Sequence, residues 1–203
     1  MDYLGLLNAN AYLTNMLLVP SIVFSVLITR RIRSWTGDTD PVHTSTYATI
    51  WLFVTGIFIV AFIFSNIHHL FMFTKNRLLV RIGDIDSRYT APLLALMLLA
   101  LNIVYIVYIS SPCNDAHGQL KKMTQPIYVI SAILSLMGAL SYVVRKRLVR
   151  RGTASSSVRD KSIYITGHVF FHYTVYTGTM LLLLLFYVEN KAIYNSLFAR
   201  DSC

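Results

Sequence analysis

The sequence predicts an all-α fold, a polytopic bundle of transmembrane helices, and three observations lead to this prediction. Of the 203 residues, 55% are hydrophobic and only 13% are charged, whereas a soluble domain carries about 25% charged residues. The apolar residues gather into five runs, each of about the length needed to cross a bilayer. The net charge of +9 lies in short clusters between these runs, which is typical of loops flanking membrane spans. We therefore expect a single integral membrane domain over residues 1–203 and no nucleic-acid partner.

Each apolar run qualifies as a span because a helix needs about 20 mostly apolar residues to cross the hydrocarbon core. The five runs cover residues 12–29, 48–73, 89–109, 126–144 and 165–188. Basic clusters close the first and fourth runs: Arg30, Arg31, Arg33, Arg145, Lys146 and Arg147. The second run is longer than a span requires, so we expect it to tilt or to project into the interface. No run alternates with a period of two over about ten residues, as a transmembrane barrel requires.

Five spans place the two chain ends on opposite sides of the membrane. The side that holds the N-terminus carries more lysine and arginine, so the positive-inside rule favours that side as cytoplasmic. Asp2 stands where a signal peptide has a basic region, and no signal peptide is expected. The two cysteines, Cys113 and Cys203, are too few for a disulfide scaffold or a structural zinc finger.

Polar residues interrupt the spans in a pattern that points to a site. Ser65 and His69 lie four residues apart near the end of the second span, and His168 and His172 lie four apart at the start of the fifth. Residues at this spacing share one face of a helix. Ionisable groups within spans are costly and usually functional. Counting the spans puts both pairs, and the aspartates that precede the third span, at one membrane level.

These residue types fit a zinc site. Three imidazoles and one open position suit tetrahedral zinc, and His-x3-His on a helix directs two nitrogens towards one point. We predict that zinc is the cofactor and that its ligands are His69, His168 and His172. Asp86 would orient a ligand or accept a proton, and Ser65 would polarise a carbonyl group or hold a water molecule. Two second choices remain at neighbouring positions: His68, about 100° around the helix, and Asp84.

Each of these groups also has another interpretation. A His-x3-His pair occurs by chance in apolar chains, histidines at a span end can reach the interface, and the aspartates can be loop carboxylates beside neighbouring arginines. A second cofactor is also compatible, because His69 and His172 on facing helices would serve as axial ligands of a b-type haem. Haem leaves His168 and Ser65 without a role, so zinc is favoured.

The same residues resemble the CREST superfamily of multi-span membrane proteins, which includes alkaline ceramidases, progestin/adiponectin receptors and myomaker. Its marks are a Ser and a His four apart near the end of one span, an Asp at the start of the next span, and His-x3-His in the last span. The matching residues are Ser65, His69, Asp86, His168 and His172. The resemblance implies that the three histidines bind zinc, with the Asp and Ser nearby. It also implies seven spans, whereas five are counted here.

Within that superfamily the chain is most similar to the myomaker branch. The paired histidines at 68 and 69 end the second span, and the last span, HVFFHYTVYTGTMLLLLL, joins an aromatic-rich His-x3-His to a leucine run. The basic loop RKRLVRRGTASSSVRDKSIY and the first span LLVPSIVFSVLITRRIR are also similar to that branch. This resemblance implies a role in cell–cell membrane fusion of the myoblast type. Ser65 looks more like the hydrolytic branches.

Three function hypotheses follow. The first is a zinc-site membrane protein that promotes cell–cell fusion. The second is a zinc-dependent lipid hydrolase similar to the alkaline ceramidases, an amidase in which Ser65 and Asp86 are catalytic. The third is a membrane anchor subunit that carries a b-type haem. All three expect membrane lipids as partners in the plasma membrane or an endomembrane such as the Golgi or ER, and leave a homo-oligomer open.

Overall fold

All regular structure in the described residues is helical, which confirms the all-α prediction. The computed structural model describes residues 9–10, 12–35, 40–70, 78, 81, 85–111, 118–152 and 158–198. Within them, five helices are long and apolar enough to cross a membrane. These stretches are Tyr12–Arg33, Pro41–His68, Arg88–Ser110, Lys122–Val144 and Ile165–Val188. The chain is therefore a multi-span helical membrane protein, as its hydropathy pattern predicts.

The helices follow one another along the chain with two short turns of other types. A 3-10 turn, η1 (Asn15–Leu17), leads into α2 (Leu18–Arg33), and a π-helical turn, η2 (Asp86–Thr90), leads into α5 (Ala91–Ser110). The other helices are α3 (Pro41–Leu70), α6 (Gly118–Gly152), α7 (Val158–Val188) and α8 (Asn190–Phe198). Pro92 lies in the first turn of α5, where a missing N–H does not break a helical hydrogen bond.

Two of the expected span boundaries are wrong. The fourth run was expected to begin at residue 126, but α6 begins at Gly118 and contains Pro126 in its interior. The second was expected over 48–73, but its helix begins at Pro41. Polar residues precede both apolar runs, so hydropathy alone does not mark where these helices start.

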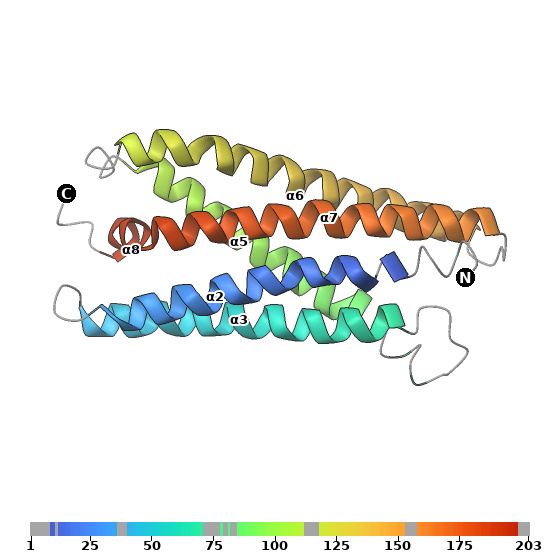
Figure 1. Ribbon diagram of the computed structural model, residues 1–203, viewed down its shortest axis with the longest axis horizontal. Coiled ribbons are helices and arrows are strands. Elements are labelled where there is room, and N and C mark those ends of the chain that lie inside the picture. Colours follow the sequence, from blue (N-terminus) through green and yellow to red (C-terminus); the bar gives the residue numbers. More distant parts are fainter. Residues whose placement is uncertain are drawn as a thin grey trace.

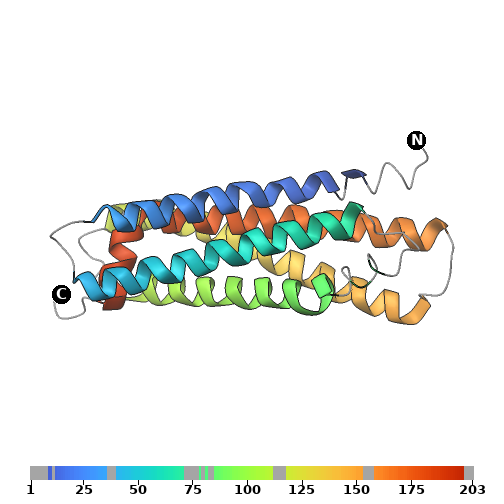
Figure 2. The ribbon, with the colours of Figure 1, turned by 90° about the horizontal axis from the view of Figure 1, so that it is seen from below.

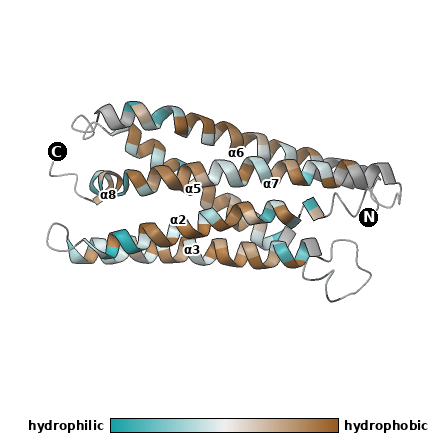
Figure 3. Cartoon of the chain, in the orientation of Figure 1, coloured by the Kyte–Doolittle hydropathy of each residue, from teal (hydrophilic) through white to brown (hydrophobic). Residues whose placement is uncertain are grey.

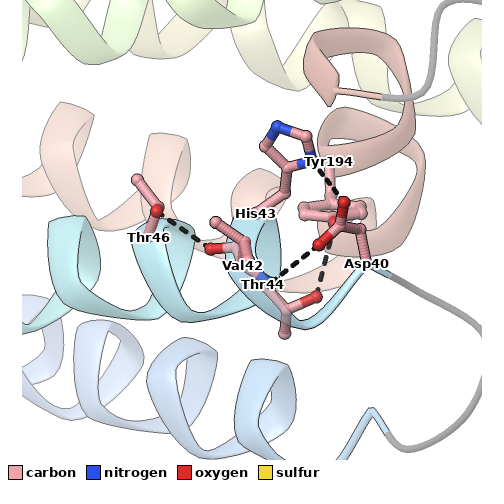
Figure 4. Close-up of polar contacts among 6 residues, drawn as sticks. All are labelled: Asp40, Val42, His43, Thr44, Thr46 and Tyr194. Carbon is pink, nitrogen blue, oxygen red and sulfur yellow. Dashed lines mark hydrogen bonds and ion pairs between the residues drawn. The ribbon is translucent and has the colours of Figure 1, made fainter.

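A side-chain cap explains the early start of α3. Asp40 Oδ1 accepts a hydrogen bond of 2.8 Å from the backbone N–H of Val42, and Pro41 occupies the first helical position. This is the arrangement that helix N-termini favour. Figure 4 shows Asp40 also paired with His43 at 3.3 Å, and Thr44 Oγ1 donating to the Tyr194 hydroxyl of α8 at 3.3 Å. The cap thus lies beside the C-terminal helix.

The long helices run up and down along a common axis, and α7 lies among the others (Figures 1 and 2). In Figure 1, α2 and α3 lie on one side of α7, α6 lies on the other, and α5 crosses obliquely. In the apolar part of α7, 56% of the residues are buried, against 11% in α6. α7 is therefore the centre of the bundle and α6 its most lipid-exposed member. α8 turns across one end (Figure 2).

Small residues allow α6 and α7 to pack closely. A Cβ atom added to Gly178 of α7 would lie 2.8 Å from the backbone oxygen of Ser131, and one added to Gly138 of α6 would overlap Val175 Cγ2. The Ser131 hydroxyl donates to the Gly178 carbonyl at 2.7 Å across this interface. Glycine and serine at such positions are typical of helix pairs in membranes.

The outer faces of the helices carry large apolar side chains, as a bilayer requires. Figure 3 shows the long helices as mainly hydrophobic. Exposed aliphatic residues cover α6, among them Ile130, Ile133, Leu136 and Leu140. Aromatic residues fill the interior towards α8, where Trp51 contacts Phe186 with ring centroids 5.3 Å apart. Polar side chains are also buried inside the bundle, where hydrogen bonds must replace their hydration.

Candidate functional site

The His-x3-His pair of α7 is buried inside the bundle. His168 is 6% exposed and His172 is 1% exposed, and their ring centroids are 4.4 Å apart. The helical spacing of four residues brings the two rings onto one face, which points away from lipid. Tyr176, one further turn along, lies 4.9 Å from the ring of His172. Two imidazoles thus share an enclosed, partly aromatic environment at the end of the bundle where α2 begins and α3 ends (Figure 1).

A threonine from the first span contacts this pair. Thr14 Oγ1 lies 3.1 Å from His172 Nδ1, and both side chains are buried. When Nδ1 carries the proton, it donates to the Thr14 oxygen and Nε2 is left with its lone pair. A hydrogen bond of this kind to the second ring nitrogen is what orients metal-ligating histidines.

Ser65 lies beside the same segment of the first span. Its hydroxyl donates a hydrogen bond of 3.1 Å to Asn15 Oδ1, and Ser65 is 7% exposed. Because Asn15 follows Thr14 in the chain, two adjacent residues connect α3 and α7. Thr14 reaches His172 of α7, and Asn15 reaches Ser65 of α3. The structure therefore brings together Ser65, His168 and His172, three of the residues predicted from sequence, through two residues that were not predicted.

The end of α3 supplies a further histidine. The ring centroid of His68 lies 6.3 Å from that of His168, so this second choice stands next to the α7 pair. His69 belongs to α3, but its side chain lies outside those described, as does that of Asp86 in η2. Asp84 falls outside the described residues altogether. The roles predicted for these three residues stay predictions.

The geometry of the rings can be compared with that of a zinc site. A zinc–nitrogen bond of about 2.0–2.1 Å puts the centroid of a ligating imidazole about 3 Å from the metal, so two such rings at a tetrahedral angle have centroids about 5 Å apart. The His168–His172 centroids, at 4.4 Å, are slightly closer than that, and the His68–His168 centroids, at 6.3 Å, are farther apart. Among the described side chains, no three His, Cys, Asp or Glu residues are grouped to hold a metal ion. A metal ion held by the α7 pair would need a further ligand from outside this set.

A second buried polar group lies at the opposite end of α7, and sequence reasoning missed it. Glu189 is 2% exposed, and its carboxylate accepts hydrogen bonds from Tyr105 at 2.6 Å and from Tyr108 and Thr124 at 3.1 Å. The signal was present, because Glu189 is the single glutamate of the sequence and directly follows an apolar run. Its partners come from α5 and α6, so this group joins three spans.

Comparison with known proteins returned no matching family model, no matching curated protein and no matching solved structure. The five apolar helices define the class: the chain is an integral membrane protein with several helical spans. Within that class, the buried histidine pair and its polar neighbours form the candidate site.

Proposed function

We propose that this chain is a zinc-binding multi-span membrane protein of the CREST type. The observation that carries the proposal is the buried His168–His172 pair, with ring centroids 4.4 Å apart, at the end of the bundle where α3 also contributes histidine. A histidine buried among apolar helices is costly and is usually functional. The resemblance of Ser65, His69, Asp86 and the His-x3-His pair to the superfamily points to the same cofactor.

In this proposal His168, His172 and His69 hold the metal, and Thr14 fixes the ring of His172. The contact of Thr14 with Nδ1 leaves Nε2 of His172 as the ligating atom. Zinc supplies Lewis-acid chemistry when it is bound. Because the ligands belong to α3 and α7, the metal would also join these two spans, as metal binding contributes to folding where a site is not preformed.

The activity that we propose is promotion of membrane fusion between cells, from the plasma membrane. Its support is the extent of the resemblance to the myomaker branch, which includes the first span, the basic loop and the last span. A fusion protein needs the metal only to hold its helices together and requires no open ligand position. Membrane lipids are then the partners on which it acts.

A second candidate is a zinc-dependent lipid amidase in an endomembrane, and one observation favours it. Ser65 is buried and lies in the same polar group as His172, connected through Asn15 and Thr14. A structural zinc site needs no hydroxyl there, whereas hydrolysis of an amide uses polar groups around the carbonyl. Asp86 would accept the proton of the attacking water.

Metal analysis of the purified protein tests the cofactor. We expect about one zinc per chain, the stoichiometry of a single tetrahedral site, and no Soret band in the visible spectrum. His168→Ala and His172→Ala should each lose the metal. His43→Ala is the matched control, because His43 is half-exposed at the other end of α3. A Soret band without zinc would instead support a haem anchor, and zinc retained in both α7 variants would contradict the proposed ligands.

Two assays then separate fusion from hydrolysis. If the protein promotes fusion, its expression on two labelled cell populations mixes their contents, and Ser65→Ala leaves mixing nearly intact. If it is an amidase, the purified protein cleaves a ceramide, and both Ser65→Ala and Asp86→Ala lower turnover by about 100-fold, as loss of a residue that supports a transition-state hydrogen bond, or of a general base, does. Amidase activity that depends on Ser65, without cell mixing, would overturn the fusion proposal.

A further inference from the structure

The amide of Asn15, beside the histidine pair, has one atom that is hydrogen-bonded and one that is not. The side chain is 1% exposed, and Oδ1 accepts the hydrogen bond from Ser65. Nδ2 is buried and has no hydrogen-bond partner among the described residues. Its two N–H groups therefore face a part of the bundle interior without an acceptor from the described part of the chain.

Asn66 and Asn190 also carry buried amide atoms without a hydrogen-bond partner among the described residues, but only Asn15 of these three contacts Ser65. Most buried polar groups in proteins are hydrogen-bonded, and each exception calls for a reason such as a bound ligand. The setting here suggests the reason, because Asn15 follows Thr14, which contacts His172, and Asn15 itself contacts Ser65. The donor without a partner thus lies within the group of residues around the histidine pair.

We propose that Asn15 Nδ2 donates a hydrogen bond to the carbonyl oxygen of an acyl lipid bound beside the histidines. This inference rests on the proposed function, since it treats the histidine site as a place where lipid binds. An amide N–H pair is complementary to an oxygen acceptor, and asparagine serves in this way in oxyanion holes. The ligand would reach a site between membrane spans from the bilayer, where acyl carbonyls are the common neutral acceptors.

Ser65 then acts through Asn15. Its hydroxyl hydrogen is directed to Asn15 Oδ1, at 3.1 Å, so it is not directed to a ligand. This bond fixes which way the amide faces and turns Nδ2 away from Ser65. Ser65 is therefore a positioning residue, and Asn15 is the residue that contacts the lipid.

Ligand binding to the purified full-length protein in detergent tests this assignment. The probes are a fluorescent short-chain ceramide and its thioamide analogue, in which sulfur, a weak acceptor, replaces the carbonyl oxygen. Wild type should bind the ceramide about 3- to 10-fold more tightly than the analogue, the ratio that one hydrogen bond supplies. Asn15→Ala should weaken ceramide binding by a similar factor and bind the two probes equally.

Four further variants and one separate measurement complete the experiment. Asn15→Asp should bind as poorly as Asn15→Ala, because a carboxylate cannot donate, and Ser65→Thr should restore the binding that Ser65→Ala loses. Asn102→Ala is the matched control, because Asn102 donates to the Leu98 carbonyl of its own helix. Zinc content is measured for every variant and should not change.

Several results would overturn the proposal. Failure of wild type to bind ceramide, equal binding of both probes by wild type, or full binding by Asn15→Ala would each do so. Tight binding by Asn15→Asp would mean that the amide oxygen faces the ligand. If wild type held no zinc but its ceramide binding depended on Asn15, the metal proposal would fail and this inference would stand.

Discussion

The hydroxyl of Tyr105 donates a hydrogen bond of 2.6 Å to Glu189 Oε2, far from the histidines and at the opposite end of α7. Tyr108 and Thr124 donate to the other oxygen of the same carboxylate, each at 3.1 Å. A buried polar group is tolerated when hydrogen bonds replace its hydration. Glu189 therefore holds α5 and α6 to the end of α7.

Replacing Glu189 should destabilise the bundle. In Glu189→Ala three buried hydroxyls lose their acceptor, and we expect the free energy of unfolding to fall by about 2–4 kcal/mol. Glu189→Gln keeps one acceptor oxygen and should cost less than half as much. Unfolding in mixed detergent micelles measures both, and equal stability of Glu189→Ala and wild type would contradict the role given to this carboxylate.

The interface between α6 and α7 should tolerate no added methyl group at Gly178. A Cβ there meets the backbone oxygen of Ser131 at 2.8 Å, and backbone cannot move aside as a side chain can. We expect Gly178→Ala to lower the free energy of unfolding by about 1–3 kcal/mol. Gly56→Ala is the control, because Gly56 is helical with nothing within 4 Å of an added Cβ. That variant should be neutral or slightly stabilising.

Removal of the Thr14 hydroxyl should weaken metal binding without abolishing it. Thr14→Val keeps the shape of the side chain but loses the contact with His172 Nδ1. Loss of a hydrogen bond that orients a ligating histidine costs about 10–100-fold in metal affinity, and Thr14→Ser should recover most of it. Competition with a chromophoric chelator measures the zinc dissociation constant. An unchanged constant in Thr14→Val would mean that Thr14 does not orient a ligand.

Chelation should lower thermal stability in wild type but not in His172→Ala. A ligand at 100 times its dissociation constant stabilises the folded state by about 2.7 kcal/mol, and removing it reverses that gain. Thermal unfolding with and without EDTA gives the comparison. If wild-type protein that holds zinc melts at the same temperature with and without EDTA, the metal does not hold α3 and α7 together.

Much of the fold could be predicted because the bilayer imposes a strong pattern. A span must be about 20 apolar residues long, and this rule located the five candidate membrane helices found in the described part of the chain. Their starts were harder to place. The cap at Asp40 and the helical turns before Pro126 are polar, so hydropathy assigned them to loops.

Only the part of the site that follows from helical periodicity could be predicted from the sequence. His168 and His172 are four residues apart, and helical geometry alone puts them on one face. Thr14 and Asn15 have no such signal, because their contacts depend on how α2 packs against α3 and α7. The sequence makes His68 only a second choice because it points about 100° from His69, yet its ring is near His168. The angular position of a residue on its own helix does not tell which side chains of a neighbouring helix lie close to it.

The contact between Thr14 and His172 joins residues 158 positions apart in the chain, and this separation sets an order of events during biosynthesis. At about 5–20 residues per second, a ribosome needs about 8–30 s to add the intervening chain. During that interval Thr14 and Asn15 enter the translocation machinery while the last span has not yet been made. The contact between Thr14 and His172 can form only when α7 inserts between helices that are already in the bilayer. A chain truncated before α7 would leave these side chains facing lipid, and so would differ from the finished protein in a way that membrane quality control can detect.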